Sequence, residues 1–408
     1  MRSLPIRLLA RSALACAVAV GSFACADLLT SAPGEGDTFD APVEGLTAGE
    51  RAAFVRGDAE FGRRFSPASG LGPVFNNVSC ASCHSGDGRG RLENSLSRIG
   101  SAADGFLSEL GGPQIQDRAI PGAQPEPVPA GVAVSVRLPP PVFGVGLIEA
   151  IPEATIVALA DPDDANGDGI SGRPNWVFAG AYVPASEPGA GTGLKLGRFG
   201  RKAQTSSLLE QTVEAYHQDI GITSEFRPTE NRNPMSGLPI DALDAAPDPE
   251  VPTSTVQAVV HYIRALAPPA AGALTAARAE GEALFTSIGC ALCHTPTLTT
   301  GAHKLSALAH KSVPLYSDML LHDMGDALAD NRPDGSATGR EWRTTPLWGL
   351  RLMRQFLHGQ AFLMHDGRAR SVEEAILQHA GEGLSSRTAF AALSAAQRAA
   401  LLDFVESR

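Results

Sequence analysis

Two five-residue segments hold the residue types best suited to redox chemistry. Both read C-x-x-C-H, as Cys80-Ala81-Ser82-Cys83-His84 and as Cys290-Ala291-Leu292-Cys293-His294. In a helical turn the two thiols lie on one face, where each can add to a vinyl group of haem, and the next imidazole can bind the iron. The spacing therefore predicts two covalently attached c-type haems, with His84 and His294 as proximal iron ligands.

Zinc binding and dithiol redox chemistry are the main alternative uses of paired cysteines. A zinc site would require both pairs to converge on one ion, and it leaves the two following histidines unexplained. A thioredoxin-like dithiol belongs in a βαβ unit, and the sequence around the pairs does not show that pattern. Disulfide bonds are a further alternative, because they form readily in exported proteins. Haem attachment consumes all four thiols, so we expect no catalysis by a free cysteine.

The N-terminus predicts export. Residues 1–26 combine three arginines, a short apolar run and Ala24-Cys25-Ala26, which resembles a signal-peptide cleavage site. The apolar run is too short to span a bilayer comfortably, so we expect no membrane span. Lipid attachment at Cys25 is the alternative, although Ser22 stands where lipoprotein signals usually have Leu. Both alternatives place the mature protein outside the cytoplasm, and we expect it in the periplasm.

The charge of the chain limits its partners. The formal net charge is −11 over 408 residues. Residues 1–26 contain three arginines and no acidic side chain, so their removal makes the mature chain more acidic still. An acidic surface argues against nucleic acid and anionic membranes, whereas a basic electron-donor protein is compatible with it.

A weak internal repeat surrounds the two motifs. Before the first motif, a helical pattern opens at Leu46-Thr47-Ala48 and continues through Gly57-Asp58-Ala59-Glu60-Phe61. Before the second, Leu274-Thr275-Ala276 continues through Gly281-Glu282-Ala283-Leu284-Phe285. Closing helices are expected at Val256 to Leu266 and at Ser394 to Val405. A helix before the haem and a crossing helix at the end are typical of cytochrome c domains.

These patterns predict a mainly α fold of two cytochrome c-like domains with long irregular loops. The N-terminal domain is expected at 46–267, with a large insertion at about 85–250, and the C-terminal domain at 273–408. The Pro268-Pro269-Ala270-Ala271-Gly272 segment interrupts the helical pattern and is the expected linker. An insertion of that length is usually functional.

One segment of the insertion resembles the start of a calcium-binding loop. Asp164, Asn166 and Asp168 supply oxygen ligands at positions 1, 3 and 5, and Gly169 stands at position 6. Position 12 is Asn175, where an EF-hand would carry a bidentate Glu. Two interpretations stay open: a calcium site, and an ion-free turn of the kind that Asp, Asn and Gly favour.

Seven further segments stand out between about Gly57 and Phe404: Val74–Asn77, Gly146–Pro152, Gly167–Gly172, Gly197–Gly200, Leu321–Gly325, Glu341–Thr344 and His365–Arg368. With these segments the chain resembles the di-haem oxidoreductases, a thiol oxidoreductase-like and peroxidase-like family related to bacterial di-haem cytochrome c peroxidases and to MauG. The resemblance implies two facing cytochrome c folds, haem binding and electron transfer. Peroxide is then the expected substrate, and a small redox protein, a cytochrome c or a cupredoxin, is the expected electron donor.

The resemblance also implies catalytic residues near the first haem. Leu209-Glu210-Gln211 resembles the L-x-x-Q stretch that places a Gln near the peroxide site, so Gln211 is a candidate donor. Glu214 or Asp219 would be the base. The E-M pair that follows in those peroxidases is not evident in this chain. An exposed helix face is the alternative interpretation of Gln211 and Glu214.

Near the second haem, Met324 is the candidate sixth iron ligand, and His322 is its rival. Arg368 could pair with haem propionates, or it could belong to a structural turn before the next helix. Trp342 and Trp348 could line a path between the haems, although packing explains each equally well. The remaining histidines are interpreted as ordinary surface or buried residues: His217, His261, His303, His310, His358 and His379.

Three functions follow from these features. The leading hypothesis is a periplasmic di-haem oxidoreductase that reduces hydrogen peroxide. The second is a non-catalytic electron carrier in which both irons have six ligands. The third is a MauG-like enzyme that oxidises protein side chains. The long insertion favours a substrate or partner surface, whereas the missing E-M pair favours the carrier.

Overall fold

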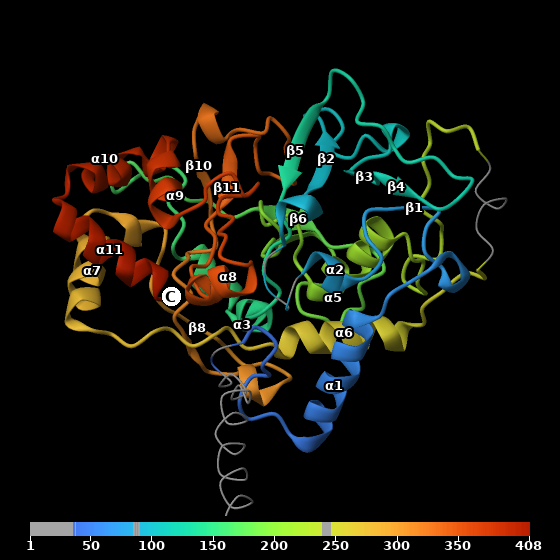
Figure 1. The fold of residues 1–408 in the computed structure, drawn as a ribbon, viewed down its shortest axis with the longest axis horizontal. Coiled ribbons are helices and arrows are strands. Elements are labelled where there is room, and N and C mark those ends of the chain that lie inside the picture. The colour runs from blue at the N-terminus through green and yellow to red at the C-terminus, as the bar shows by residue number, and fades with distance from the viewer. Residues whose placement is uncertain (1–35, 37, 85, 87, 89, 239–245) are drawn as a thin grey trace, which may run out of the picture.

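A computed structural model describes residues 36, 38–84, 86, 88, 90–238 and 246–408. The expected signal segment 1–26, with Cys25, lies outside these residues. The helices are α1 (Ala48–Gly62), α2 (Cys80–Cys83), α3 (Val145–Ala150), α4 (Glu153–Val157), α5 (Leu208–Glu214), α6 (Thr253–Ala265), α7 (Ala276–Ser287), α8 (Leu350–Phe356), α9 (Val372–Gln378), α10 (Leu384–Ala392) and α11 (Ala395–Glu406). Most are short, as the frequent Gly and Pro residues lead one to expect (Figure 1).

The strands form small antiparallel sheets. They are β1 (Val74–Phe75), β2 (Leu96–Gly100), β3 (Gln114–Ile115), β4 (Arg118–Ala119), β5 (Ala133–Arg137), β6 (Trp176–Phe178), β7 (Leu194–Leu196), β8 (Leu298–Thr299), β9 (Ser312–Val313), β10 (Leu321–Asp323) and β11 (Glu341–Arg343). Strand β2 lies between β3 and β5, and the other pairs are β1–β4, β6–β7, β8–β9 and β10–β11. The expected insertion therefore contains β2 to β7 and α3 to α5, and it is not one irregular loop.

The internal repeat corresponds to two close helix crossings, α1 against α6 and α7 against α11. A Cβ on Gly57 would lie 2.2 Å from the carbonyl oxygen of Ala258, and one on Gly281 would lie 2.2 Å from that of Ala400. Glycine is therefore what lets each pair of backbones approach. Four residues after each glycine, Phe61 and Phe285 place their ring centroids 6.1 and 6.2 Å from the rings of the two motif histidines.

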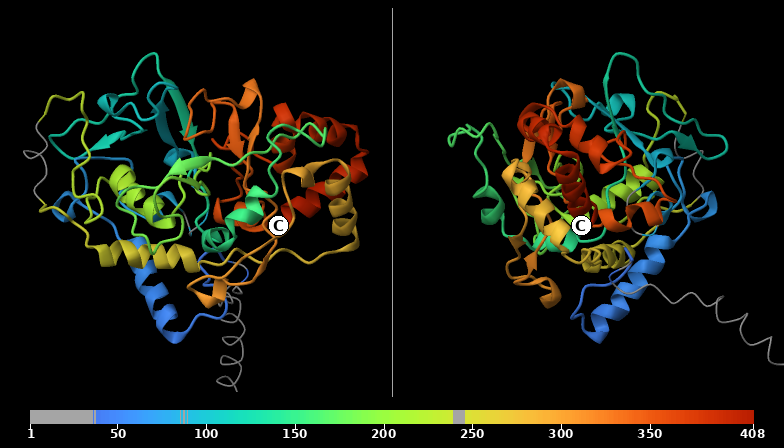
Figure 2. Two further views of the ribbon diagram at one scale, coloured as in Figure 1. Left: turned by 180° about the vertical axis from the view of Figure 1, so that it is seen from behind. Right: turned by 60° about the vertical axis from the view of Figure 1, so that its left-hand side comes forward.

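Buried apolar side chains form two clusters, and each cluster contains residues from both halves of the chain. The larger cluster joins α1, α3, α5 and α6 with residues from Leu298 to Leu320. The smaller cluster joins α7, α8 and α11, and it includes Leu138 from the first half. Figures 1 and 2 show the corresponding halves side by side, with α1 and α6 in one and α7, α10 and α11 in the other. The division at 267 and 273 stays a prediction.

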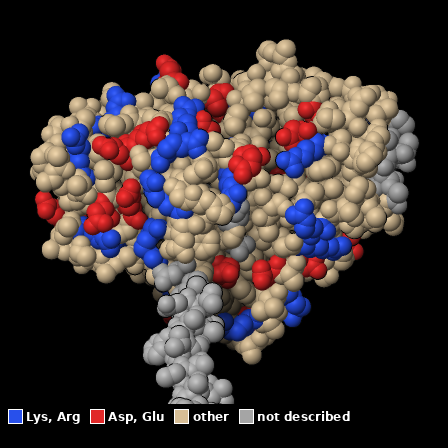
Figure 3. All heavy atoms as spheres, viewed as in Figure 1, with Lys and Arg blue, Asp and Glu red and all other residues tan. Residues whose placement is uncertain are grey.

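The surface carries charges of both signs. Figure 3 shows acidic and basic side chains interspersed across the face viewed. Within the described ranges, each helix is too short or too polar to cross a lipid bilayer.

The glycine crossings predict a strong effect of one added methyl group. We expect Gly57→Ala and Gly281→Ala each to lower the free energy of unfolding by about 1–3 kcal/mol, because the new Cβ forces the helices apart. Denaturant unfolding followed by circular dichroism measures the change. The control is Gly49→Ala in α1, where a Cβ meets no atom within 4 Å. Helix propensity favours Ala over Gly, so Gly49→Ala should not be destabilising. A loss at position 57 no larger than that at position 49 would show that the crossing is not responsible.

Candidate redox site

Each C-x-x-C-H motif lines a large cavity. Cavity 1 is bordered by Cys80, Cys83 and His84. Cavity 2 is bordered by the corresponding residues of the second motif. Each cavity therefore has two thiols and one imidazole on its wall, which is the donor set that attaches and ligates a c-type haem. The residues present fit that group.

Helical turns place both thiols of each pair on one side. Ser79 caps α2 by accepting a hydrogen bond from the Ser82 amide (3.2 Å), and Cys290–Leu292 form a 3₁₀ turn. The four cysteines are not joined in disulfides. Burial raises the pKa of the Cys83 and Cys290 thiols to about 12, so both thiols are protonated in this structure.

Both motif histidines are held neutral, the form that binds a metal. Burial lowers the pKa of His84 and of His294 to about 4. The Nδ1 of His294 donates to the carbonyl oxygen of Tyr316 (2.9 Å), because a carbonyl can only accept. Its Nε2 therefore carries the lone pair, and that pair is available for iron.

Cavity 2 contains a second imidazole of the same kind. The Nδ1 of His379 donates to the carbonyl oxygen of Ala375 (2.7 Å), so its lone pair is also on Nε2. Burial lowers the pKa of His379. The two rings are close enough for a charge on His379 to lower the pKa of His294. Sequence reasoning treated His379 as ordinary, and only the fold brings it to this cavity.

His322 has no lone pair left for iron. Its Nε2 lies 2.8 Å from Asp318 and its Nδ1 lies 2.7 Å from Glu382, so both nitrogens donate to carboxylates. Burial alone would lower the pKa of His322, but these hydrogen bonds raise it well above the usual value. Met324 lines the same cavity, as do Met364 and His365. The predicted ligand Met324 therefore has a rival in His379 and not in His322.

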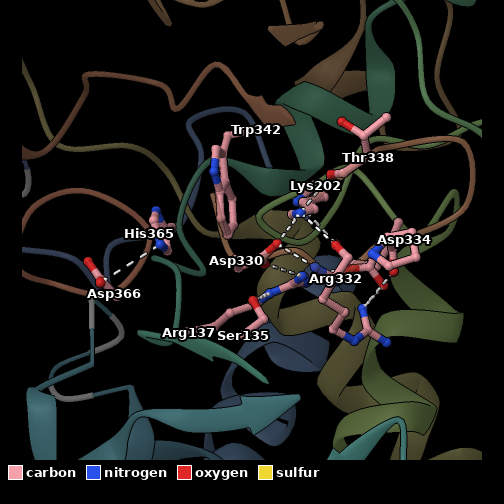
Figure 4. Close-up of polar contacts among 12 residues, drawn as sticks. Ser135, Arg137, Lys202, Asp330, Arg332, Asp334, Thr338, Trp342, His365 and Asp366 are labelled. Carbon is pink, nitrogen blue, oxygen red and sulfur yellow. Dashed lines mark hydrogen bonds and ion pairs between the residues drawn. The ribbon is translucent and has the colours of Figure 1, made fainter. Parts of the chain in front are cut away.

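Trp342 is fixed between two side chains beside cavity 2. The ring of His365 stacks on it at 3.7 Å between centroids, and the Lys202 ammonium lies 4.4 Å from its ring centroid (Figure 4). Its Nε1 donates to the carbonyl oxygen of Leu328 (2.9 Å). Of the two cavities, Trp342 lines only cavity 2, and Trp348 lines only cavity 1. These contacts give Trp342 a packing role, which is one of the two roles that the sequence analysis allowed for it.

Cavity 1 differs in its supply of iron ligands. Of the described residues that line it, His84 is the only histidine, and none is Met, Tyr or Lys. Its polar side chains include Gln211, Glu214 and Asp219, which lie on α5 and the π-helical turn Ala215–Ile220 that follows. Such π turns are frequent at functional sites.

The three candidate catalytic residues differ in their hydrogen bonds and in their pKa values. The Oε1 of Gln211 is buried, with no hydrogen-bond partner among the described residues. Burial would raise the pKa of Glu214, but Arg227, which pairs with it at 2.7 Å, lowers that pKa. Burial raises the pKa of Asp219 to about 6, although Gln114 donates to it at 2.6 Å. Asp219 is therefore better suited than Glu214 to exchange a proton.

The comparisons with known proteins agree with this donor set. The family described as "Di-haem oxidoreductase, putative peroxidase" matches residues 26–99 and 128–408. The chain belongs to the di-haem oxidoreductase family. No curated protein matches it.

Two solved structures are similar at low identity. One is hydrazine synthase of Kuenenia stuttgartiensis, pressurised with 20 bar xenon, at 16% identity and a TM-score of 0.36, with 93% of this chain and 97% of that chain covered. The other is a MauG-like protein associated with microbial copper homeostasis, at 15% identity and a TM-score of 0.38, with 93% and 94% covered.

The expected propionate partner Arg368 does not line either cavity. Its guanidinium pairs with Asp366 (2.7 Å) and donates to the carbonyl oxygen of Ala327 (3.0 Å), which is the structural turn that the sequence allowed. Other arginines, which sequence reasoning missed, line the cavities. They are Arg98, Arg137 and Arg198 in cavity 1, Arg387 in cavity 2, and Arg201 and Arg343 in both.

The calcium-like loop is closed by its own hydrogen bonds. Asp164 accepts from the Gly169 amide, and Asn166 accepts from the Asp168 amide (2.9 Å). Asn175, at position 12, is buried and donates to the carbonyl oxygens of Lys202 (2.7 Å) and Asp334 (2.8 Å). It is therefore committed elsewhere. Calcium binding by Asp164, Asn166 and Asp168 stays a prediction.

The hydrogen bonds of His322 to Asp318 and Glu382 predict a large effect on stability. We expect His322→Leu to lower the free energy of unfolding by about 3–5 kcal/mol, because Asp318 and Glu382 lose the cation between them. Asp323→Asn, which breaks an exposed pair with Arg340, should cost less than about 1 kcal/mol. Denaturant titration compares the two.

The same hydrogen bonds make the free energy of unfolding depend on pH. Because the folded-state pKa of His322 is raised, its contribution is complete below its unfolded pKa of about 6.5. The contribution is lost as the pH rises through the folded-state pKa. If the wild type and His322→Leu lost stability in parallel over that range, the pairing would be wrong.

Proposed function

We propose that this chain is a periplasmic di-haem c-type oxidoreductase that reduces hydrogen peroxide with electrons from a small redox protein. The two haems would be attached to Cys80 and Cys83 and to Cys290 and Cys293, in two cytochrome c-like units. The observation that carries the proposal is the unequal supply of iron ligands in the two cavities. An open iron suits peroxide, and a six-coordinate iron suits electron transfer.

Cavity 1 is the proposed peroxide site. Bound haem supplies the redox-active iron there, with His84 as its proximal ligand. Above pH about 6 Asp219 is ionised and can accept a proton from peroxide. Gln211 can donate an amide hydrogen to the departing oxygen. Reduction to two water molecules takes two electrons from the donor protein and two protons from solvent, and Asp219 returns the proton that it accepted.

Cavity 2 is the proposed electron-transfer site. His294 and His379 each offer a neutral nitrogen to it, so an iron there would have two imidazole ligands. A carrier function, the main alternative, needs a sixth ligand in cavity 1 as well. Among the described residues of that cavity, no second histidine, methionine, tyrosine or lysine offers one.

The ligand assignment in cavity 2 predicts a spectral change. We expect His379→Ala to convert one haem of the oxidised protein from low spin to high spin, because its sixth ligand is lost. Absorption spectra of the mature holoprotein measure the change, with haem content showing that both groups are retained. Met324→Leu is the matched control and should leave the spectrum unchanged. The opposite pattern would restore Met324 as the ligand.

The base in cavity 1 predicts a kinetic effect. We expect Asp219→Asn to slow the reaction of the half-reduced holoprotein with peroxide by about 10²–10⁴-fold. In the wild type the rate should fall as the pH drops below about 6, because protonated Asp219 cannot accept a proton. Stopped-flow absorbance measures both.

The control is Glu210→Gln. Glu210 lies on α5, accepts a hydrogen bond from the Gly180 amide and does not line either cavity. This variant should keep the wild-type rate and the acid limb. An acid limb that survives in Asp219→Asn would assign the proton to another group.

A further inference from the structure

Two arginines and a threonine line both cavities: Arg201, Arg343 and Thr345. Arg343 is the last residue of β11, which lies between the helices of the two halves in Figure 1. Burial is the main cause that lowers the pKa of His84 in cavity 1 and of His365 in cavity 2, and the positive charge of Arg201 adds to the lowering of both. Cationic groups therefore stand where the two cavities meet, and their field reaches both.

Arg343 is held in place by neutral acceptors. Its Nε donates to the carbonyl oxygen of Gly200 (3.2 Å), and its Nη1 donates to that of Thr344 (3.1 Å) and to the sulfur of Met319 (3.3 Å). Within the described part of the chain, no carboxylate forms an ion pair with it. Burial lowers the pKa of Arg343 to about 10. The charge of Asp318 opposes that lowering without forming an ion pair, so a further anion beside the guanidinium would stabilise it.

Haem supplies such anions, because each haem carries propionate carboxylates, and Nη2 is the guanidinium nitrogen that the three hydrogen bonds of Arg343 leave for them. We infer that Arg343 is a propionate-binding residue shared by both haems, and that its charge raises the reduction potential of each. This inference rests on the proposed binding of two haems. A positive charge in a low-dielectric setting favours the less positive, reduced iron. The shared position extends that effect to both irons.

The experiment is a spectroelectrochemical titration of the mature holoprotein and three variants. Arg343→Gln should lower both midpoint potentials. Arg198→Gln should lower the potential of haem 1 alone, because Arg198 lines cavity 1 and not cavity 2. Arg387→Gln should lower that of haem 2 alone, because Arg387 lines only cavity 2. The contrast between one shifted potential and two is the readout.

A shift of only one potential in Arg343→Gln, or of neither, would overturn the inference. If that variant lost its haem, Arg343→Lys replaces it. The lysine keeps the charge without the hydrogen-bond geometry of the guanidinium, so both potentials should fall by less. A fall confined to one haem would again overturn the shared role. The proposed function fails separately, if the wild type itself does not carry two haems by intact mass.

Discussion

Neutral imidazole nitrogens in deep cavities are the feature on which the remaining chemistry depends. A histidine binds iron only without its proton, and burial keeps the pKa of His84 and His294 at about 4. The helix crossings at Gly57 and Gly281 bring Phe61 and Phe285 close to these rings. The repeated helix pair thus builds the apolar surroundings that hold each imidazole neutral.

The two halves meet through a buried network of charges. Figure 4 shows Lys202 bound to Asp330, with Arg137 paired to Asp330 and Asp334. Arg137 lines cavity 1, while Trp342, beneath the Lys202 ammonium, lines cavity 2. Removing one partner of such a network leaves an uncompensated buried charge. The network therefore favours one relative placement of the two cavities.

Local patterns were readable from the sequence, and long-range ones were not. The spacing of Cys80, Cys83 and His84 predicts a turn that the structure contains, and the helix expected to open at Leu46-Thr47-Ala48 begins at Ala48 with Thr47 as its N-cap. His379 could not be singled out, because it follows the end of α9 and lies 85 residues after His294 (379 − 294), so only the packing of α9 against cavity 2 brings the two together. Arg368 was an attractive carboxylate partner by type, yet its nearest carboxylate is Asp366, two residues away.

The central claim is that the two irons differ in coordination. Low-temperature electron paramagnetic resonance of the oxidised mature holoprotein tests it most directly. The account predicts one high-spin ferric signal, from the cavity lined by His84 alone among histidines, and one low-spin signal, from the cavity in which His379 joins His294. Two low-spin signals would contradict it, because both irons would then have six ligands and peroxide would have no open position.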